Sequence, residues 1–140
     1  EISLGLVGSE MCIRDRATQI QIEDVVHKNP AFIVKVSDAN VYSSYIPPKK
    51  EDMEKIWNDI CLRPGWSDMD AIKQNHILLL SHYAHGGASK LVGTMYIAKF
   101  LYPDKLPDLH PEEVFKKWVT VYEGLEYQTG HTFPAYELND

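Results

Sequence analysis

Aromatic and imidazole side chains gather in two short polar segments, residues 38–48 and 82–87, each of which follows an apolar run. Flat aromatic rings with polar tips suit a large, partly apolar small molecule, and tyrosine or histidine can hydrogen-bond its acidic groups. A tryptophan between a glycine and a serine is expected to form a third side of the ligand-binding site. The candidate ligand-binding residues are Tyr42 and Tyr45 in the first segment, His82, Tyr83 and His85 in the second, and Trp66.

The residues of these segments do not form a recognisable catalytic or metal-binding motif. His82 and His85 lie on an expected loop, and no third ligand lies near them in sequence, whereas zinc needs three or four. The chain has no Gly-x-Gly-x-x-Gly phosphate loop, and Cys61 has no base beside it in sequence. We therefore expect no catalytic residue, no metal ligand and no cofactor.

Two apolar runs are expected to be buried strands that position the polar segments. Residues 31–37 are rich in β-branched side chains, and residues 77–81 are apolar except for the last. Helices are expected over 20–29, 51–62, 88–102 and from 109 onward, with a helical turn at 69–73 and a short extended segment at 132–136. Because strands and helices alternate, the expected fold is α/β with a doubly wound parallel sheet. Two strands make a poor sheet, so the domain is expected to be partial.

Apolar residues at helical spacing predict which face of each helix is buried. In the helix 51–62 this stripe includes Cys61, which we interpret as a small core residue. The predicted inward residues are Met53, Ile56, Trp57, Ile60 and Cys61 in that helix, Leu91, Val92, Met95, Tyr96 and Phe100 in the next, and Val114, Phe115, Trp118, Val121 and Tyr122 in the last.

Composition narrows the class of protein. The chain has 140 residues, which suits one domain, and a formal net charge of −6 with acids and bases interspersed. Nucleic-acid binding would need a clustered basic face, so we expect no nucleic-acid partner. No apolar run reaches the roughly 18 residues of a membrane span. Two cysteines are too few for a disulfide scaffold.

The first sixteen residues are expected not to belong to the natural protein. Residues 6–16 (LVGSEMCIRDR) match the translation of a transposon-based sequencing adapter in one reading frame. The alternative is an ordinary strand over residues 2–7 followed by a glycine turn. On the adapter interpretation, residues 1–16 are set aside as one sets aside an expression tag, and residues 17–140 are expected to come from a longer, truncated chain.

Three segments in order carry a resemblance to a known family. Residues 22–36 (IEDVVHKNPAFIVKV) are similar to its helix, Asn-Pro-Asp and apolar strand, although Ala31 replaces the aspartate. Residues 64–80 (PGWSDMDAIKQNHILLL) are similar to its Ala-Val-Lys, Asn, basic residue and strand, with His76 in place of the basic residue. Residues 86–118 resemble its closing helices. The family is the ABC-transporter solute-binding proteins for iron–siderophore, haem and cobalamin, and the resemblance is to their C-terminal lobe.

This resemblance implies two α/β lobes joined by one long helix, with the ligand held between them. Residues 17–140 would be a partial C-terminal lobe of a non-enzymatic protein that works in the periplasm or on the outer face of the cytoplasmic membrane. Its expected partners are a metal chelate and an ABC permease, and it would touch a membrane only through the permease or a lost N-terminal anchor. The alternative is a fragment of a cytoplasmic doubly wound α/β enzyme.

Overall fold

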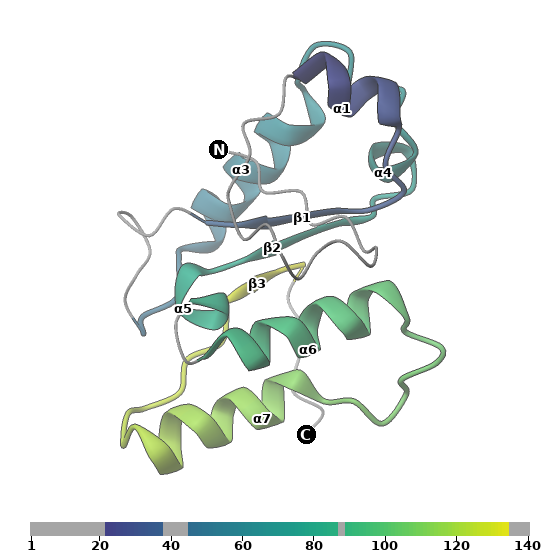
Figure 1. Ribbon diagram of the computed structural model, residues 1–140. Coiled ribbons are helices and arrows are strands. Elements are labelled where there is room, and N and C mark those ends of the chain that lie inside the picture. The colour runs from purple at the N-terminus through teal and green to yellow at the C-terminus, as the bar shows by residue number, and fades with distance from the viewer. Residues whose placement is uncertain (1–21, 38–44, 87–88, 135–140) are drawn as a thin grey trace.

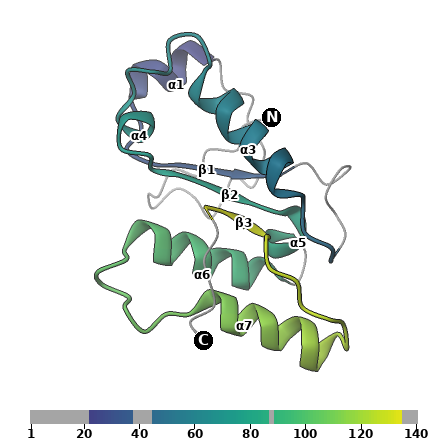
Figure 2. The same ribbon diagram turned by 180° about the vertical axis from the view of Figure 1, so that it is seen from behind.

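The computed structural model of this chain describes residues 22–37, 45–86 and 89–134. Within them, a small sheet has helices on both faces, so the predicted α/β class is confirmed (Figure 1, Figure 2). Helices α1, α3 and α4 lie on one side of the sheet, and α6 and α7 lie on the other (Figure 1). The helices are α1 (Ile22–Lys28), α3 (Lys50–Cys61), α4 (Asp70–Lys73), α5 (His82–His85), α6 (Lys90–Leu101), α7 (Pro111–Lys117) and the π-helix η2 (Trp118–Tyr122).

The sheet has three strands in the order β1-β2-β3, and it is only partly parallel. The strands are β1 (Ile33–Val36), β2 (Ile77–Leu80) and β3 (Thr132–Phe133). β1 and β2 run parallel, with Ile33 opposite Ile77, as the alternation of strands and helices predicts. The predicted parallel sheet is thus confirmed for β1 and β2, whereas β3 pairs antiparallel to β2, with Thr132 opposite Leu80. The reason is that the chain leaves η2 beside the carboxyl end of β2 and enters the sheet from that end.

The segment after β2 is a helix and not the expected loop. Residues 82–85 form α5, and the hydroxyl oxygen of Ser81 accepts a hydrogen bond of 3.0 Å from the backbone N–H of Ala84. A serine that precedes a helix and satisfies one of its free N–H groups is a favoured N-cap. The polar composition of this segment therefore reflects a short capped helix, in which Ala84 is buried against the core.

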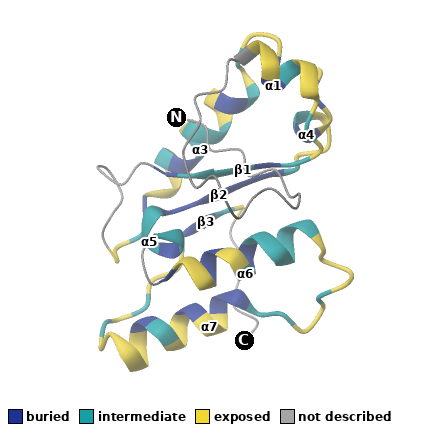
Figure 3. Cartoon of the chain, in the orientation of Figure 1, coloured by how far each residue is buried: buried dark blue, intermediate teal, exposed yellow. Residues whose placement is uncertain are grey.

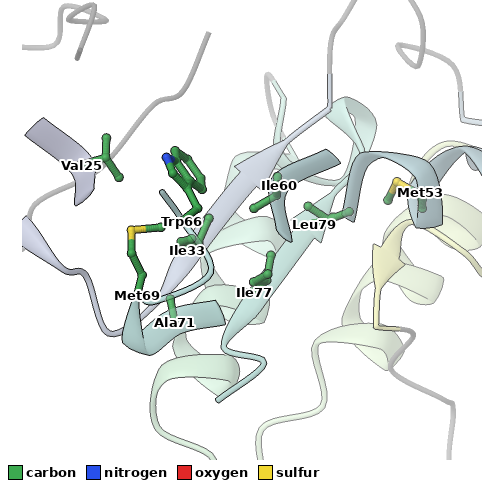
Figure 4. Packing of buried hydrophobic residues seen from close by; sticks show 9 residues of the cluster. All are labelled: Val25, Ile33, Met53, Ile60, Trp66, Met69, Ala71, Ile77 and Leu79. Carbon is green, nitrogen blue, oxygen red and sulfur yellow. The ribbon is translucent and has the colours of Figure 1, made fainter. Parts of the chain in front are cut away.

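β2 is buried on both faces and divides the core into two clusters (Figure 3). Its four residues are each at most 1% exposed, which explains why the strand is apolar without alternation. Ile77 and Leu79 pack toward α3 and α1 (Figure 4), whereas Leu78 and Leu80 pack toward α6 and α7. The buried residues of the first cluster are Val25, Ile33, Met53, Ile60, Trp66, Met69, Ala71, Ile77 and Leu79, and those of the second are Leu78, Leu80, Ala84, Val92, Tyr96, Phe115 and Val119.

The predicted inward faces are correct for α3 and only partly correct for the later helices. Met53 and Ile60 are buried, and the other three residues of that stripe pack against the same cluster. On α6, the buried stripe is the narrow one that contains Val92, Gly93 and Tyr96, and Leu91 is 70% exposed, contrary to the prediction. The half-buried partners of the second cluster include Phe100 and Trp118.

On α7 and η2 the buried face is rotated away from the predicted one. The inward positions are Phe115 and Val119, which lie four residues apart, and both are at most 2% exposed. Val114, Val121 and Tyr122 are 40%, 65% and 69% exposed, so their predicted burial is wrong. The prediction assumed one α-helical pitch throughout, whereas the chain changes to a π-helix at η2, which alters the angle between successive side chains from Trp118 onward. Val114 lies before this change, and its exposure is not explained by it.

Replacing Phe115 by alanine is expected to destabilise the fold strongly. Its ring is fully buried and contacts the rings of Tyr83, Tyr96, Tyr127 and His131. Truncating such a residue typically costs about 3–5 kcal/mol of unfolding free energy. Urea unfolding followed by circular dichroism measures this loss. A matched control is V121A, which should change stability by less than about 0.5 kcal/mol because that side chain is exposed. Equal effects of the two substitutions would contradict the assigned core.

Candidate functional site

The carboxyl ends of β1 and β2 lie side by side, where ligands bind in open α/β sheets. The two ends are tied together, because the backbone N–H of His82 donates a 3.1 Å hydrogen bond to the hydroxyl of Ser37. Ser37 directly follows β1, and His82 opens α5 directly after Ser81. The first polar segment, including Tyr42, lies mostly outside the described residues, so the described part of the candidate site consists of α5 and its neighbours.

A buried serine and histidine hold α5 against the C-terminal part of the chain. The hydroxyl oxygen of Ser81 lies 2.7 Å from Nδ1 of His131, and Nε2 of His131 lies 3.0 Å from the carbonyl oxygen of Tyr45. A carbonyl can only accept, so Nε2 carries the proton and Nδ1 accepts from the Ser81 hydroxyl. The backbone N–H of Ser81 also donates to the carbonyl of His131 at 2.8 Å. Ser81 therefore caps α5 and anchors the segment before β3 at once.

This serine–histidine contact is a structural joint. Ser81 is 0% exposed and His131 is 2% exposed, so the hydroxyl is closed to a substrate. Nε2 of His131 is already used by a backbone carbonyl, and burial lowers the pKa of His131 to about 4, opposed by the bond to Tyr45. The imidazole is thus neutral near pH 7 and locked in one tautomer. Sequence reasoning missed this pair, and the only available signal was a serine between an apolar strand and a helix.

The buried histidine predicts that stability depends on pH. Its pKa is lower in the folded chain, about 4, than its ordinary value of 6.5, so the unfolded chain binds more protons between these values. The free energy of unfolding should fall by about 2–3 kcal/mol as pH drops from 7 to 4. Urea unfolding at a series of pH values measures this fall. In H131Q the fall should be clearly smaller, and an unchanged pH profile in that variant would contradict the assignment.

Tyr83 lies at the tip of β2 with its ring half-buried. The ring packs against both Phe115 and His131, with centroid distances of 5.8 Å and 5.6 Å. Its hydroxyl donates a hydrogen bond to Oε2 of Glu123, and Oε1 of Glu123 accepts from Nε1 of Trp118 at 2.9 Å. Both oxygens of this carboxylate are therefore engaged. Glu123 was not among the residues expected from the sequence. It lies 40 residues after Tyr83, and no local pattern indicates that this part of the chain folds back against α5.

Two glycines leave room for the histidines of α5, because each lies so close to a histidine that a Cβ atom would clash with it. A Cβ at Gly93 of α6 would lie 2.1 Å from Nδ1 of His85, and a Cβ at Gly86 would lie 2.5 Å from the carbonyl oxygen of His82. Glycine is therefore required at both positions for these rings and backbones to approach so closely. Burial lowers the pKa of His85, with smaller contributions from Lys90 and His82. Its Nδ1 atom is buried and has no hydrogen-bond partner among the described residues.

Replacing Gly93 by alanine should have opposite effects in two backgrounds. In the original chain the new methyl group would displace the His85 ring, so G93A is expected to lower stability by about 1–3 kcal/mol. In H85G the obstacle is gone, because even the Cβ of His85 would lie 2.7 Å from the new methyl group, and the higher helix propensity of alanine should then raise stability by up to about 1 kcal/mol. A double-mutant cycle in urea measures the difference. Additive effects would show that the two residues do not contact each other.

The remaining predicted residues divide between the site and the core. Tyr45 is 37% exposed and reaches the site through its carbonyl bond to His131. Trp66 is 1% exposed and packs in the first cluster beside Val25 and Met69 (Figure 4). That cluster region adjoins the amino ends of the strands, so the prediction of Trp66 as a wall of the site is wrong. The glycine before it adopts a φ of +79°, which turns the chain back under α1.

Other features of the described residues add no metal or membrane element. No group of three or more His, Cys, Asp or Glu side chains there is arranged to hold a metal ion. None of the helices in the described ranges is long and apolar enough to cross a bilayer. An open groove of about 400 Å³ lies between α3 and β3, lined by Glu54, Trp57, Asn58, Phe133 and Pro134. Burial raises the pKa of the Cys61 thiol, in keeping with its packing against the first cluster.

Comparison with known proteins gives a likeness of fold. No family model matches the chain, and no curated protein matches it. Among solved structures, it is similar to a TroA-like periplasmic binding protein, FepB from Veillonella parvula, with a TM-score of 0.71 and 19% sequence identity. The match covers 92% of this chain and 38% of that protein. The chain thus has the fold of part of a TroA-like periplasmic binding protein and spans well under half of that neighbour's length.

Proposed function

We propose that residues 17–140 are part of the C-terminal lobe of an extracytoplasmic solute-binding protein of an ABC importer. The protein would bind a metal chelate and deliver it to a permease in the cytoplasmic membrane. The observation that carries this proposal is the fold likeness to a periplasmic binding protein, which extends over 92% of the chain. Because the match covers 38% of that protein, the proposal includes a second lobe, which would complete the site.

The position of α5 supports the binding role. Its polar and aromatic side chains stand where two parallel strands end, which is where α/β folds hold their ligands. We assign ligand contact to His82, Tyr83 and His85 on α5 and to Tyr45 beside it, and Tyr42 remains a candidate that lies outside the described residues. A half-buried aromatic ring with polar neighbours suits a chelate that is large and partly apolar.

The choice of a metal chelate rests on the sequence resemblance described above. Three segments of the chain resemble segments of the proteins for iron–siderophore, haem and cobalamin. In the fold these segments form α1 with β1, α4 with β2, and α6 with α7. The same resemblance carries the proposed permease partner and the location outside the cytoplasmic membrane. In this proposal no bond is made or broken, and the one serine–histidine contact at the strand end serves the packing of α5.

Ligand titration of the complete protein that contains residues 17–140 tests the proposal. We expect at least one of a ferric siderophore, haem and cobalamin to bind, measured by calorimetry. The substitution Y83A should weaken that binding by about tenfold or more, since an aromatic contact at a desolvated site is commonly worth over 1 kcal/mol. The control Y102A removes a tyrosine that is 50% exposed at the far end of α6, and it should leave the affinity unchanged.

Two outcomes would overturn the proposal. One is the absence of binding by all three chelates to a folded complete protein. The other is a gene in which residues 17–140 continue into a cytoplasmic catalytic domain in place of a second binding lobe, which would favour the α/β enzyme considered from the sequence.

A further inference from the structure

Four hydrogen-bond donors around the tip of β2 are used within the protein. Tyr83 has a single hydroxyl proton, and it is donated to Oε2 of Glu123. The indole N–H of Trp118 is donated to the other oxygen of the same carboxylate, at 2.9 Å. The backbone N–H of His82 is donated to Ser37, and the Ser81 hydroxyl to His131. Tyr83 therefore offers a ligand the lone pairs of its oxygen and not its proton.

This arrangement reverses one expectation drawn from the sequence. A free tyrosine hydroxyl would donate to the acidic groups of a ligand, but here Glu123 has taken that place. A ligand that approaches the Tyr83 oxygen must bring its own donor, such as an amine, amide or hydroxyl. A ligand carboxylate or phenolate would meet an oxygen lone pair with a carboxylate directly behind it, and such contacts are repulsive.

The charged side chains around α5 also disfavour a negatively charged ligand. Glu123 is solvent-exposed, but its position is fixed because both oxygens are held, so its negative charge stays beside Tyr83. On the positive side, Lys90 acts on His85 from the first turn of α6. Burial lowers the pKa of both His85 and His131. The charges of Lys90 and Glu123 roughly cancel, and a polyanion would need an excess of cations to replace its hydration.

We propose that Glu123 makes the site at α5 selective for neutral or positively charged chelates with hydrogen-bond donors on their rim, and selective against polyanionic chelates. This inference rests on the proposed function, because it assumes that a chelate binds at the tip of β2. Glu123 acts in it as a specificity-determining residue: it takes the Tyr83 proton and adds one negative charge next to the ligand.

Three ferric chelates of comparable size test the inference in the complete protein: a cationic trihydroxamate, a neutral trihydroxamate and a trianionic tricatecholate. We expect the first two to bind at least tenfold more tightly than the third. In E123Q, the ratio of cationic to trianionic affinity should fall by about tenfold, because one unit of charge is removed beside the ligand. The control D104N makes the same change of charge on an exposed residue in the loop after the carboxyl end of α6, opposite the end of that helix that adjoins α5 (Figure 1), and should leave the ratio unchanged.

A second variant separates the charge from the hydroxyl. Y83F removes the oxygen that accepts from the ligand and leaves the carboxylate held by Trp118, so it should weaken the cationic and neutral chelates while keeping their preference over the trianion. Equal or tighter binding of the trianion to the original protein, or an unchanged ratio in folded E123Q, would overturn the charge selection alone. Failure of all three chelates to bind would overturn the proposed function and this inference with it.

Discussion

The burial of β2 on both faces is the constraint on which the rest of the fold depends. A four-residue strand with no exposed face needs a layer of helices on each side, and the two clusters on its alternate side chains supply them. Because β2 is central, its carboxyl end is also the point where the neighbouring strands, α5 and η2 converge. The candidate site is therefore positioned by a strand whose four residues are all fully buried.

The connection between core and site passes through Ser81. Its hydroxyl accepts a hydrogen bond from the backbone N–H of Ala84 in α5 and donates one to the buried His131. The other ring nitrogen of His131 donates to the backbone carbonyl of Tyr45. Segments that lie far apart in the sequence thus share one hydrogen-bonded joint in an apolar surrounding, where unpaired polar atoms are costly. α5 itself has only four residues and would not persist alone, so this joint gives it a defined place.

Much of the fold could be predicted from local pattern, because apolar runs and helical stripes are properties of short segments. The parallel pairing of β1 and β2 and the stripe on α3 are examples. The antiparallel β3 could not be predicted with confidence, since two residues carry little signal and their pairing is set by how the tail returns. The position of Tyr83 at the carboxyl end of β2 could be predicted because the apolar run before it is short and clear, whereas its contact with a ligand stays a prediction. Trp66 was misplaced because a glycine with positive φ redirects it, and Glu123 and His131 were missed because their partners are 40 and 50 residues away.

The widened turn of η2 decides where the charge beside Tyr83 stands. Trp118 and Glu123 are five positions apart, and in a regular α-helix such residues point about 140° away from each other around the axis. Here the backbone N–H of Glu123 bonds to the carbonyl of Trp118 at 3.2 Å, the spacing of a π-turn, and the indole and carboxylate meet on one side. The electrostatic character of the site is consequently encoded in the width of this turn: if the same residues were wound as a regular α-helix, the carboxylate would point away from the indole while every side chain at the tip of β2 stayed in place.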